Sequence, residues 1–128
     1  MSRNNRHFRK ATASRHQGKM SNIALTIVYE DNHLLAISKP ANLPTMGVAP
    51  DKDSLLTVAK QYIKQKYAKP GNVYLGIVSR LDAPVTGLIM IARTSKAATR
   101  LNESFRGRQA RKLYWALVEG VPAPSVPG

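Results

Sequence analysis

The first apolar runs of the chain lie at residues 27–30 and 34–38, and both are rich in β-prone side chains. The Asp-Asn pair at residues 31–32 separates them and favours a turn. The pattern therefore predicts an antiparallel hairpin, with order beginning near Ile23. The Lys-Pro pair at residues 39–40 ends the second strand, because proline lacks the amide hydrogen that a strand ladder needs.

A helical pattern follows the loop after this hairpin. Asn42 and Gly47 suit positive φ angles within the loop. Ser54 is a suitable N-cap, and Asp53 beside it favours the positive end of a helix. Residues on one face of the predicted helix then recur at helical spacing, at Leu55, Val58, Ala59, Tyr62, Ile63 and Lys66. The helix is predicted to stop before residues 69–72, Lys-Pro-Gly-Asn.

The second half of the chain predicts three more strands and one helix. Residues 73–78 and 87–92 are β-prone, and the second run is apolar throughout, as in a central strand covered on both faces. Ser95 is predicted to cap a helix that ends near Phe105, with Ala98, Leu101 and Phe105 facing inward. Residues 113–118 are predicted to form a fifth strand.

These elements lack a regular βαβ repeat. They predict an α+β fold with a mixed, largely antiparallel central sheet and flanking helices. Residues 1–22 contain basic residues, no acid and almost no apolar side chain, which indicates a disordered basic arm. Residues 23–120 are predicted to form the folded domain, and residues 121–128 a proline-rich tail.

Composition narrows the function classes. The chain has 128 residues, enough for one domain, and no cysteine, which excludes a disulfide scaffold and thiolate chemistry. Its three histidines, His7, His16 and His33, are scattered, so no metal site is expected. No apolar run approaches the roughly 20 residues that span a bilayer. We expect a soluble, cytoplasmic protein with no membrane partner.

The charge balance points to a polyanionic partner. Twenty Lys and Arg against seven Asp and Glu give a net charge of +13. Such a surface attracts nucleic-acid phosphates and speeds their encounter. A charge excess that only keeps the protein soluble remains the alternative at this point.

Asp82 is the acid whose setting differs from that of the others. It lies between two apolar strands, and Arg80 precedes it by two residues. In an extended segment the two side chains would share one face, and the arginine would keep the carboxylate ionised and oriented. This arrangement fits a nucleophile, although an ordinary ion pair at a strand end fits it equally well.

Three segments, in order, resemble the RluA-type RNA pseudouridine synthases, which act on uridines of ribosomal and transfer RNA. Residues 79–82, Ser-Arg-Leu-Asp, and 86–88, Thr-Gly-Leu, resemble the family's Arg-Leu-Asp-x-x-x-(Thr/Ser)-Gly motif. Residues 27–31 and 37–45 resemble its opening hairpin and Lys-Pro motif, and residues 111–120 resemble its Lys-x-Tyr-x-Ala-x-Val-x-Gly strand.

The resemblance implies an isomerase that flips a uridine out of the RNA stack and attacks it with Asp82. Arg80 would fill the gap left by the flipped base or pair with RNA. Tyr114 would lie against the flipped uracil, whereas from the residues alone it fits a core tyrosine on a strand. Thr86 and Gly87 would shape the turn that presents Asp82. No cofactor is implied.

Two further groups of residues receive roles from the same resemblance. Lys39 and Pro40 would hold the loop rather than touch the substrate. The loop at residues 106–112 would contact the RNA backbone, although a solvated basic loop without a partner remains the alternative. Its basic residues are Arg106, Arg108, Arg111 and Lys112.

The chain departs from the family pattern in three places. Ser79 stands where many relatives have histidine, and Asn42 replaces a usual glycine, whose left-handed conformation asparagine tolerates. A later family motif, with an arginine that pairs with the catalytic aspartate, is not found before Gly128. We therefore expect a truncated chain that is weakly stable and inactive alone.

Two alternatives to an active enzyme remain open from the sequence. One is a non-catalytic RNA-binding module that keeps the fold and the basic surface. The other is a basic ribosome-associated structural protein, for which RNA binding would be indifferent to Arg80 and Tyr114.

Overall fold

The computed structural model describes residues 12–15 and 23–124. The strands and helices of this part, in chain order, are β1 (Thr12–Arg15), β2 (Ala24–Glu30), β3 (Leu34–Lys39), α1 (Leu55–Lys66), β4 (Gly76–Ile77), β5 (Gly87–Ala92) and α2 (Ser95–Arg106). No helix of this part is long and apolar enough to cross a membrane.

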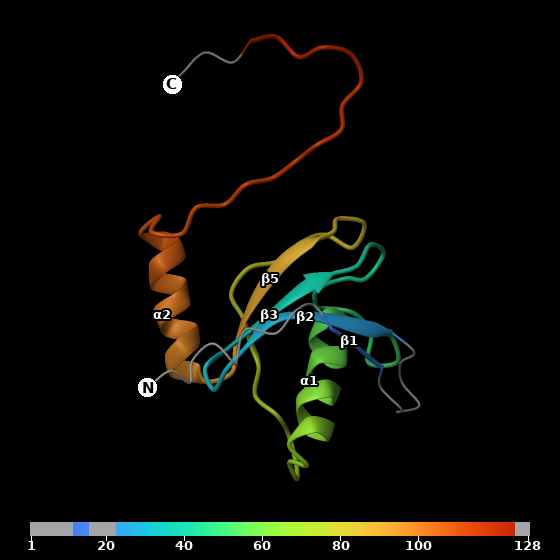
Figure 1. Cartoon of the computed structure of the whole chain (residues 1–128), viewed down its shortest axis with the longest axis vertical. Helices are drawn as coiled ribbons and strands as arrows, with labels where there is room; N and C mark the ends of the chain where they lie inside the picture. The colour runs from blue at the N-terminus through green and yellow to red at the C-terminus, as the bar shows by residue number, and fades with distance from the viewer. Residues whose placement is uncertain (1–11, 16–22, 125–128) are drawn as a thin grey trace.

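The strands form one sheet in the order β1-β2-β3-β5-β4, and every described pairing is antiparallel. The β3–β5 ladder runs from Leu34 opposite Ala92 to Lys39 opposite Gly87. The β2–β3 register shifts by a residue between Ile27 and Tyr29. An α+β fold with an antiparallel sheet, as predicted, is confirmed (Figure 1).

The hairpin turn owes its shape to Asp31. Its Oδ1 atom accepts hydrogen bonds from the backbone amides of His33 and Leu34, both at 2.7 Å. Its Oδ2 atom accepts one from the Tyr29 hydroxyl at 2.6 Å. Burial by itself would raise the pKa of Asp31, but these hydrogen bonds outweigh it and lower that pKa. The predicted turn is thus held by its own carboxylate.

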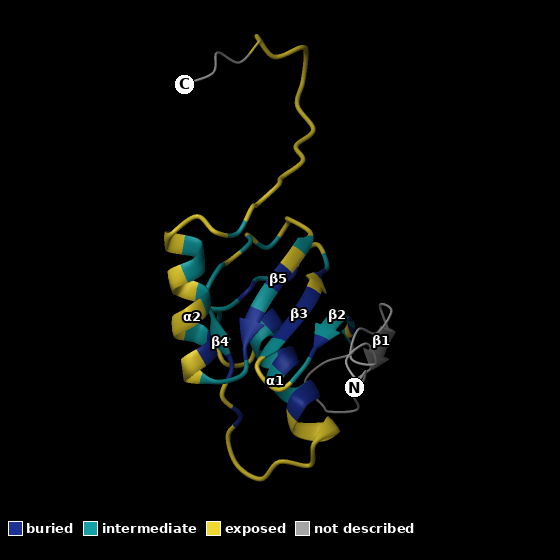
Figure 2. Ribbon diagram, turned by 60° about the vertical axis from the view of Figure 1, so that its left-hand side comes forward, coloured by how far each residue is buried: buried dark blue, intermediate teal, exposed yellow. Residues whose placement is uncertain are grey.

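Helix α1 packs its apolar side against the sheet and completes the core. Ser54 caps it as predicted: its side chain accepts from the amide of Thr57, and the Thr57 hydroxyl accepts from the amide of Ser54. Five of the six predicted positions of α1 are buried, namely Leu55, Val58, Ala59, Tyr62 and Ile63, whereas Lys66 at the end of the helix is exposed. Figure 2 shows the buried colour concentrated on the central strands and on this helix.

Glu30 is a buried carboxylate that ties the end of β2 to the end of α1. It accepts hydrogen bonds from the Tyr62 hydroxyl at 2.6 Å, from Lys66 Nζ at 3.0 Å and from the Tyr67 hydroxyl. Burial alone would raise the pKa of Glu30. The bonds from the two tyrosines and the lysine outweigh burial and hold the pKa below its ordinary value of 4.5.

The N-cap of helix α2 lies one residue earlier than predicted. Thr94, not Ser95, is the N-cap, and its hydroxyl accepts from the Ala97 amide at 3.0 Å. Of the residues of α2 only Ala97 is buried, and the predicted inward residues Ala98, Leu101 and Phe105 are half-buried. This helix therefore packs more loosely than α1, as its largely exposed surface in Figure 2 shows.

Three predictions about strands need correction. Residues 1–22 were predicted to be disordered, but Thr12–Arg15 pairs antiparallel with residues 24–27 of β2, which offers them a free edge. The rest of that segment lies outside the described residues. The strand predicted at residues 73–78 is reduced to Gly76–Ile77, because β5 pairs only its last two residues with it.

The third correction concerns residues 113–118, which form no strand. Among the described residues no strand lies alongside them, and a strand requires a hydrogen-bonding partner. Their side chains are exposed, and in Figure 2 this segment leaves the domain as an extended trace. The tail that follows, as far as residue 124, is exposed as well.

Candidate active site

Asp82 lies in the loop that joins β4 to β5. The amide of Val85 donates to the carbonyl of Asp82 at 3.0 Å and closes a turn. The chain then enters β5 at Gly87, where a Cβ atom would lie 3.0 Å from Cδ1 of Leu81, so a side chain there would crowd the loop. The Asp82 side chain is exposed, and in the described part of the chain its carboxylate accepts no hydrogen bond.

The backbone before Asp82 is fixed by Thr45. The Thr45 hydroxyl donates to the carbonyl of Leu81 at 2.7 Å and accepts from the amide of Leu81 at 3.1 Å. Thr45 is buried, and it lies in the loop between β3 and α1. One side chain therefore satisfies both backbone groups of the residue that precedes the carboxylate.

The backbone after Asp82 is fixed by Lys39 and Leu43. The amide of Leu43 donates to the carbonyl of Ala83 at 3.2 Å. The Lys39 ammonium donates to the same carbonyl at 3.0 Å, to that of Leu43 at 2.7 Å and to that of Pro40 at 2.9 Å. Three donors thus meet three acceptors, which satisfies the ammonium completely. We call Lys39, Leu43 and Thr45 the clamp.

Lys39 is 1% exposed, an unusual degree of burial for a lysine. Burial lowers the pKa of its ammonium, and the negative charge of Asp82 opposes that shift. The backbone of the same loop turns at Asn42, with φ 63°, and at Gly47, with φ 81°. The prediction of positive φ at both positions is confirmed, and these turns bring the loop back toward Asp82.

Arg80 does not form the ion pair with Asp82 that the sequence suggested. Among the described residues the ion pair is that of Lys66 with Glu30. A bend at Ser79 and the lack of strand structure at residues 80–82 remove the alternation on which the prediction rested. The exposed Arg80 guanidinium instead lies toward Gly47, where a Cβ atom would be 3.6 Å from its Nη2 atom.

A pocket of about 480 Å³ lies beside the Asp82 loop. Leu81 and Val85, which flank the turn of Asp82, both line it, whereas Asp82 itself does not. Of the predicted site residues it brings together Arg80, Thr86, Gly87, Arg111, Lys112 and Tyr114. We call it the Tyr114 pocket. The structure thus gathers most of the predicted site on one side of β5.

The Tyr114 segment forms the outer wall of this pocket. Tyr114 is 67% exposed and Trp115 is 93% exposed. The prediction of a core tyrosine on a strand is therefore wrong for this structure, because no strand of the described part covers it. The segment is anchored at its start, where Lys112 Nζ lies 4.5 Å from the centre of the Phe105 ring.

The basic loop follows the end of α2. Arg106, Arg108, Arg111 and Lys112 are all exposed. None of them forms an ion pair within the described residues. Arg111 and Lys112 line the Tyr114 pocket, whereas Arg106 and Arg108 do not. The loop therefore presents uncompensated positive charge next to the pocket.

Sequence reasoning missed Thr45. A threonine in a loop gives no periodic signal, and its bonds to Leu81 join residues 36 positions apart. The signal that could have found it is its place shortly after the Lys-Pro pair, within the segment that already resembled a known family. In the described part of the chain no group of three or more His, Cys, Asp or Glu side chains could hold a metal ion.

Comparison with known proteins gives one consistent family. The model of the RNA pseudouridylate synthase family matches residues 33–126. Ribosomal large subunit pseudouridine synthase D of Pseudomonas aeruginosa is 40% identical over 99 residues, which cover 77% of this chain and 30% of that protein. A mitochondrial pseudouridylate synthase of Xenopus tropicalis is 34% identical over 101 residues, with coverage of 77% and 30%.

A solved structure agrees with these matches. The human protein RNA pseudouridylate synthase domain containing 4 superimposes with a TM-score of 0.54 and 29% identity. The match covers 65% of this chain and 30% of the human chain. The chain spans about 30% of the length of the curated relatives that it matches first.

Proposed function

The chain belongs to the RNA pseudouridylate synthase family, and on this premise we propose that it isomerises uridine to pseudouridine in RNA, with Asp82 as the nucleophile. One observation carries the proposal. The clamp fixes the backbone on both sides of Asp82, while the carboxylate itself has no hydrogen-bonding partner in the described part of the chain. An exposed charge in a fixed loop is what an attacking group requires.

The proposed reaction is an isomerisation, so nothing is added to or lost from the RNA overall. The uridine leaves its stack at a cost of a few kcal/mol. Asp82 attacks the nucleoside, at the ribose or at the base, and the bond between the base nitrogen and the ribose breaks. The uracil turns, and a carbon of the base forms the new bond to the ribose as the bond to Asp82 breaks. That carbon loses its proton, and the freed base nitrogen takes one up from solvent. These steps need no cofactor.

The Tyr114 pocket supplies the setting for the flipped base. Tyr114 presents an aromatic face and a hydroxyl, which suit stacking on uracil and assistance in removing its proton. Arg80 lies at the same pocket, where its planar guanidinium suits the gap in the RNA stack. The four basic residues of the loop after α2 suit contact with phosphates on either side. Thr86 and Gly87 are proposed to shape the turn of Asp82.

The proposed substrate is ribosomal RNA or transfer RNA. The Pseudomonas aeruginosa relative is named for the large ribosomal subunit. The net charge of +13 supports a polyanionic substrate. An activity on ribosomal RNA of the bacterial kind would take place in the cytoplasm.

A non-catalytic RNA-binding module is the second candidate, and the exposure of Tyr114 favours it. Both candidates predict RNA binding. They differ in whether product forms and whether Asp82 is needed for it.

The test is pseudouridine formation on total RNA by the purified chain, beside Asp82→Asn and the control Asp51→Asn, which changes an exposed acid that is not part of the clamp. We expect Asp82→Asn to abolish product and to leave RNA affinity within about twofold, and Asp51→Asn to change neither. RNA binding without product in the unsubstituted chain would favour the binding module. Product formation that survives Asp82→Asn would refute Asp82 as the nucleophile.

A further inference from the structure

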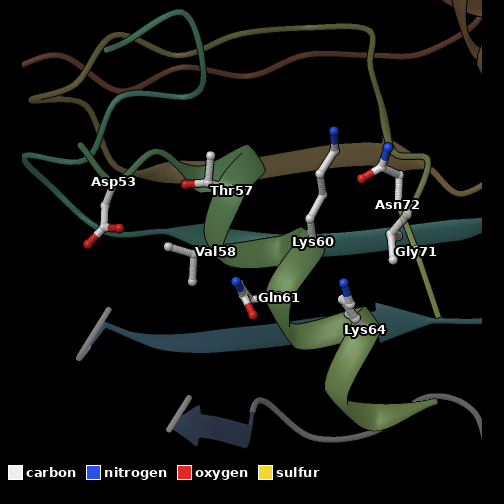
Figure 3. A pocket seen from close by; sticks show the side chains of 9 residues that line it. Asp53, Thr57, Val58, Lys60, Gln61, Lys64, Gly71 and Asn72 are labelled. Atoms are coloured by element: carbon white, nitrogen blue, oxygen red, sulfur yellow. The ribbon is translucent and has the colours of Figure 1, made fainter. Parts of the chain in front are cut away.

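A second recess lies between α1 and the segment that follows it, and we call it the α1 recess (Figure 3). Its volume is about 250 Å³. None of its lining residues lines the Tyr114 pocket, so the two hollows are separate. No role in the proposed reaction accounts for it.

The floor of the α1 recess is apolar and its rim carries donors. Val58 and Val73, which line it, are buried in the core. Lys60 and Gln61 of α1 line it as well, and both side chains are half-buried rather than fully solvated. Charges beside an apolar floor act through a lower effective dielectric constant than charges in bulk water.

Four donor side chains of the recess have no partner within the described part of the chain. They are those of Lys60, Gln61, Lys64 and Asn72. Lys66, two residues after Lys64, differs in that it pairs with Glu30 at 3.0 Å and lies over the Tyr62 and Tyr67 rings. The protein therefore satisfies the lysine at the end of α1 and leaves the two in the recess uncompensated.

Geometry directs these donors to one place. Lys60 and Lys64 are four residues apart, so they share one face of α1, with Cβ atoms about 5–6 Å apart. Gly71, with φ 74°, turns the chain so that Asn72 returns along the helix. In Figure 3 the Lys60 side chain extends from α1 toward the segment that carries Asn72, and Lys64 follows one turn further along the helix.

Asp53 is the acid of the α1 recess. Figure 3 shows it at the end of the recess away from Lys60, Lys64 and Asn72. The donor end thus carries two ammonium groups and neutral amides, with the acid set apart. This arrangement suits the compact negative charge and several acceptor oxygens of a phosphate group.

We propose that the α1 recess binds a phosphate group, and that this is a backbone phosphate of the RNA outside the flipped nucleotide; this last part rests on the proposed function. The start of α1 is bonded to the loop of the clamp, through Leu55 N to Pro44 O at 2.8 Å and Leu56 N to Thr45 O at 3.0 Å. A phosphate held on α1 is therefore held in fixed relation to Asp82, and phosphate contacts set register.

The test compares two variants that remove the same charge. Lys60→Gln with Lys64→Gln empties the recess of ammonium groups. Lys52→Gln with Lys69→Gln removes two exposed lysines that flank α1 and do not line the recess. RNA affinity is measured for the full chain from low to high salt, with circular dichroism to verify folding.

The recess variant should lower the slope of log affinity against log salt by roughly 0.7–0.9, the value for one phosphate contact, and lower affinity roughly 5- to 10-fold at about 0.1 M salt. The control variant should leave the slope unchanged. Equal losses in both variants would overturn the proposal, because they would show a diffuse charge effect. RNA binding that is absent from the unsubstituted chain would overturn it too.

A titration with inorganic phosphate separates the two sources of the ligand. Side-chain amide resonances of Gln61 and Asn72 should shift, and Asn72→Ala should weaken RNA binding without changing the salt slope. If phosphate shifts these resonances but the recess variant keeps its RNA affinity, the site binds a free phosphate compound. That result would overturn the proposal that the ligand is an RNA phosphate. Pseudouridine formation by the unsubstituted chain and by Asp82→Asn is measured separately. A failure of the proposed function can therefore be distinguished from a failure of phosphate binding in the α1 recess.

Discussion

The loop of Asp82 and the segment of Tyr114 border the same pocket, yet the protein holds them in different ways. Around Asp82 a buried ammonium, a buried hydroxyl and a backbone amide of the clamp satisfy the flanking backbone groups. Around Tyr114 the side chains are exposed and no strand lies alongside among the described residues. This part of the fold holds the Asp82 loop in place, whereas it leaves the Tyr114 segment without a neighbouring strand among the described residues.

The difference follows from where each segment finds its contacts. The clamp and the Asp82 loop are joined because β3 and β5 pair along their length, with Lys39 opposite Gly87. The sheet thus brings the ends of two neighbouring strands together. Residues 113–118 leave the end of α2, which itself buries only Ala97. A loosely packed helix gives the segment beyond it little to pack against.

Lys39→Met should most strongly reduce the difference in order between the Asp82 loop and the Tyr114 segment. Methionine fills the space of the aliphatic chain but leaves the carbonyls of Pro40, Leu43 and Ala83 without the ammonium donor. We expect a loss of about 3 kcal/mol or more in unfolding free energy. Urea denaturation measures it, with Lys52→Met as an exposed control. Equal midpoints for the two variants would show that the clamp does not stabilise the loop.

Glu30→Gln should have an intermediate effect on unfolding free energy. It also tests whether the clamp specifically holds the Asp82 loop, because it disturbs a buried charge remote from Asp82. We expect a loss of roughly 1–2 kcal/mol at neutral pH, since Lys66 is partly exposed and screened. Product formation per folded molecule should be unchanged. A drop in that specific activity would mean that any loss of stability, and not the clamp alone, displaces Asp82.

The same carboxylate predicts a pH dependence. The pKa of Glu30 is lower in the folded state than its ordinary value of 4.5. Its stabilising contribution is therefore complete above about pH 4.5 and is lost as pH falls through the lower, folded value. In urea titrations at several pH values, the acid decline of stability should be shallower in Glu30→Gln. Parallel declines in the two proteins would argue against this origin.

Trp115→Ser should have the smallest effect. Trp115 is 93% exposed, so its removal should change unfolding free energy by less than about 0.5 kcal/mol. Limited proteolysis should cut the chain within residues 111–118 before it cuts the clamp, in both the unsubstituted protein and the variant. A loss of stability comparable to that of Lys39→Met would show that this segment packs in solution, and the comparison would fail.

Local patterns predicted the core of this fold well. The hairpin around Asp31, the capping of α1 by Ser54 and the five buried positions of α1 all follow from turn chemistry and helical spacing. The place of β5 inside the sheet followed from its continuous apolar run, but the predicted cover on both faces is wrong, because Leu88 is 58% exposed. Each of these depends on residues that are close in sequence.

The errors arose where distant residues decide. Residues 113–118 carry a strand pattern, yet a pattern cannot supply the neighbouring strand. Arg80 and Asp82 were expected to share a face, but the bend at Ser79 ends the alternation. For the site, motif resemblance gathered residues of which the structure places six around one pocket, with Asp82 outside its lining. It gave no sign of Thr45, whose partner Leu81 is 36 positions away.

The burial of Lys39 also makes it a reporter of the clamp's motion. Acylating reagents attack neutral, accessible amines, so the exposed lysines of this basic chain would be labelled quickly. Lys39, which is 1% exposed and donates to three carbonyls, can react only when the clamp opens. The labelling half-time of this one amine, measured by mass spectrometry, would therefore report the rate at which the Asp82 loop separates from the clamp. RNA bound at Asp82 should lengthen this half-time.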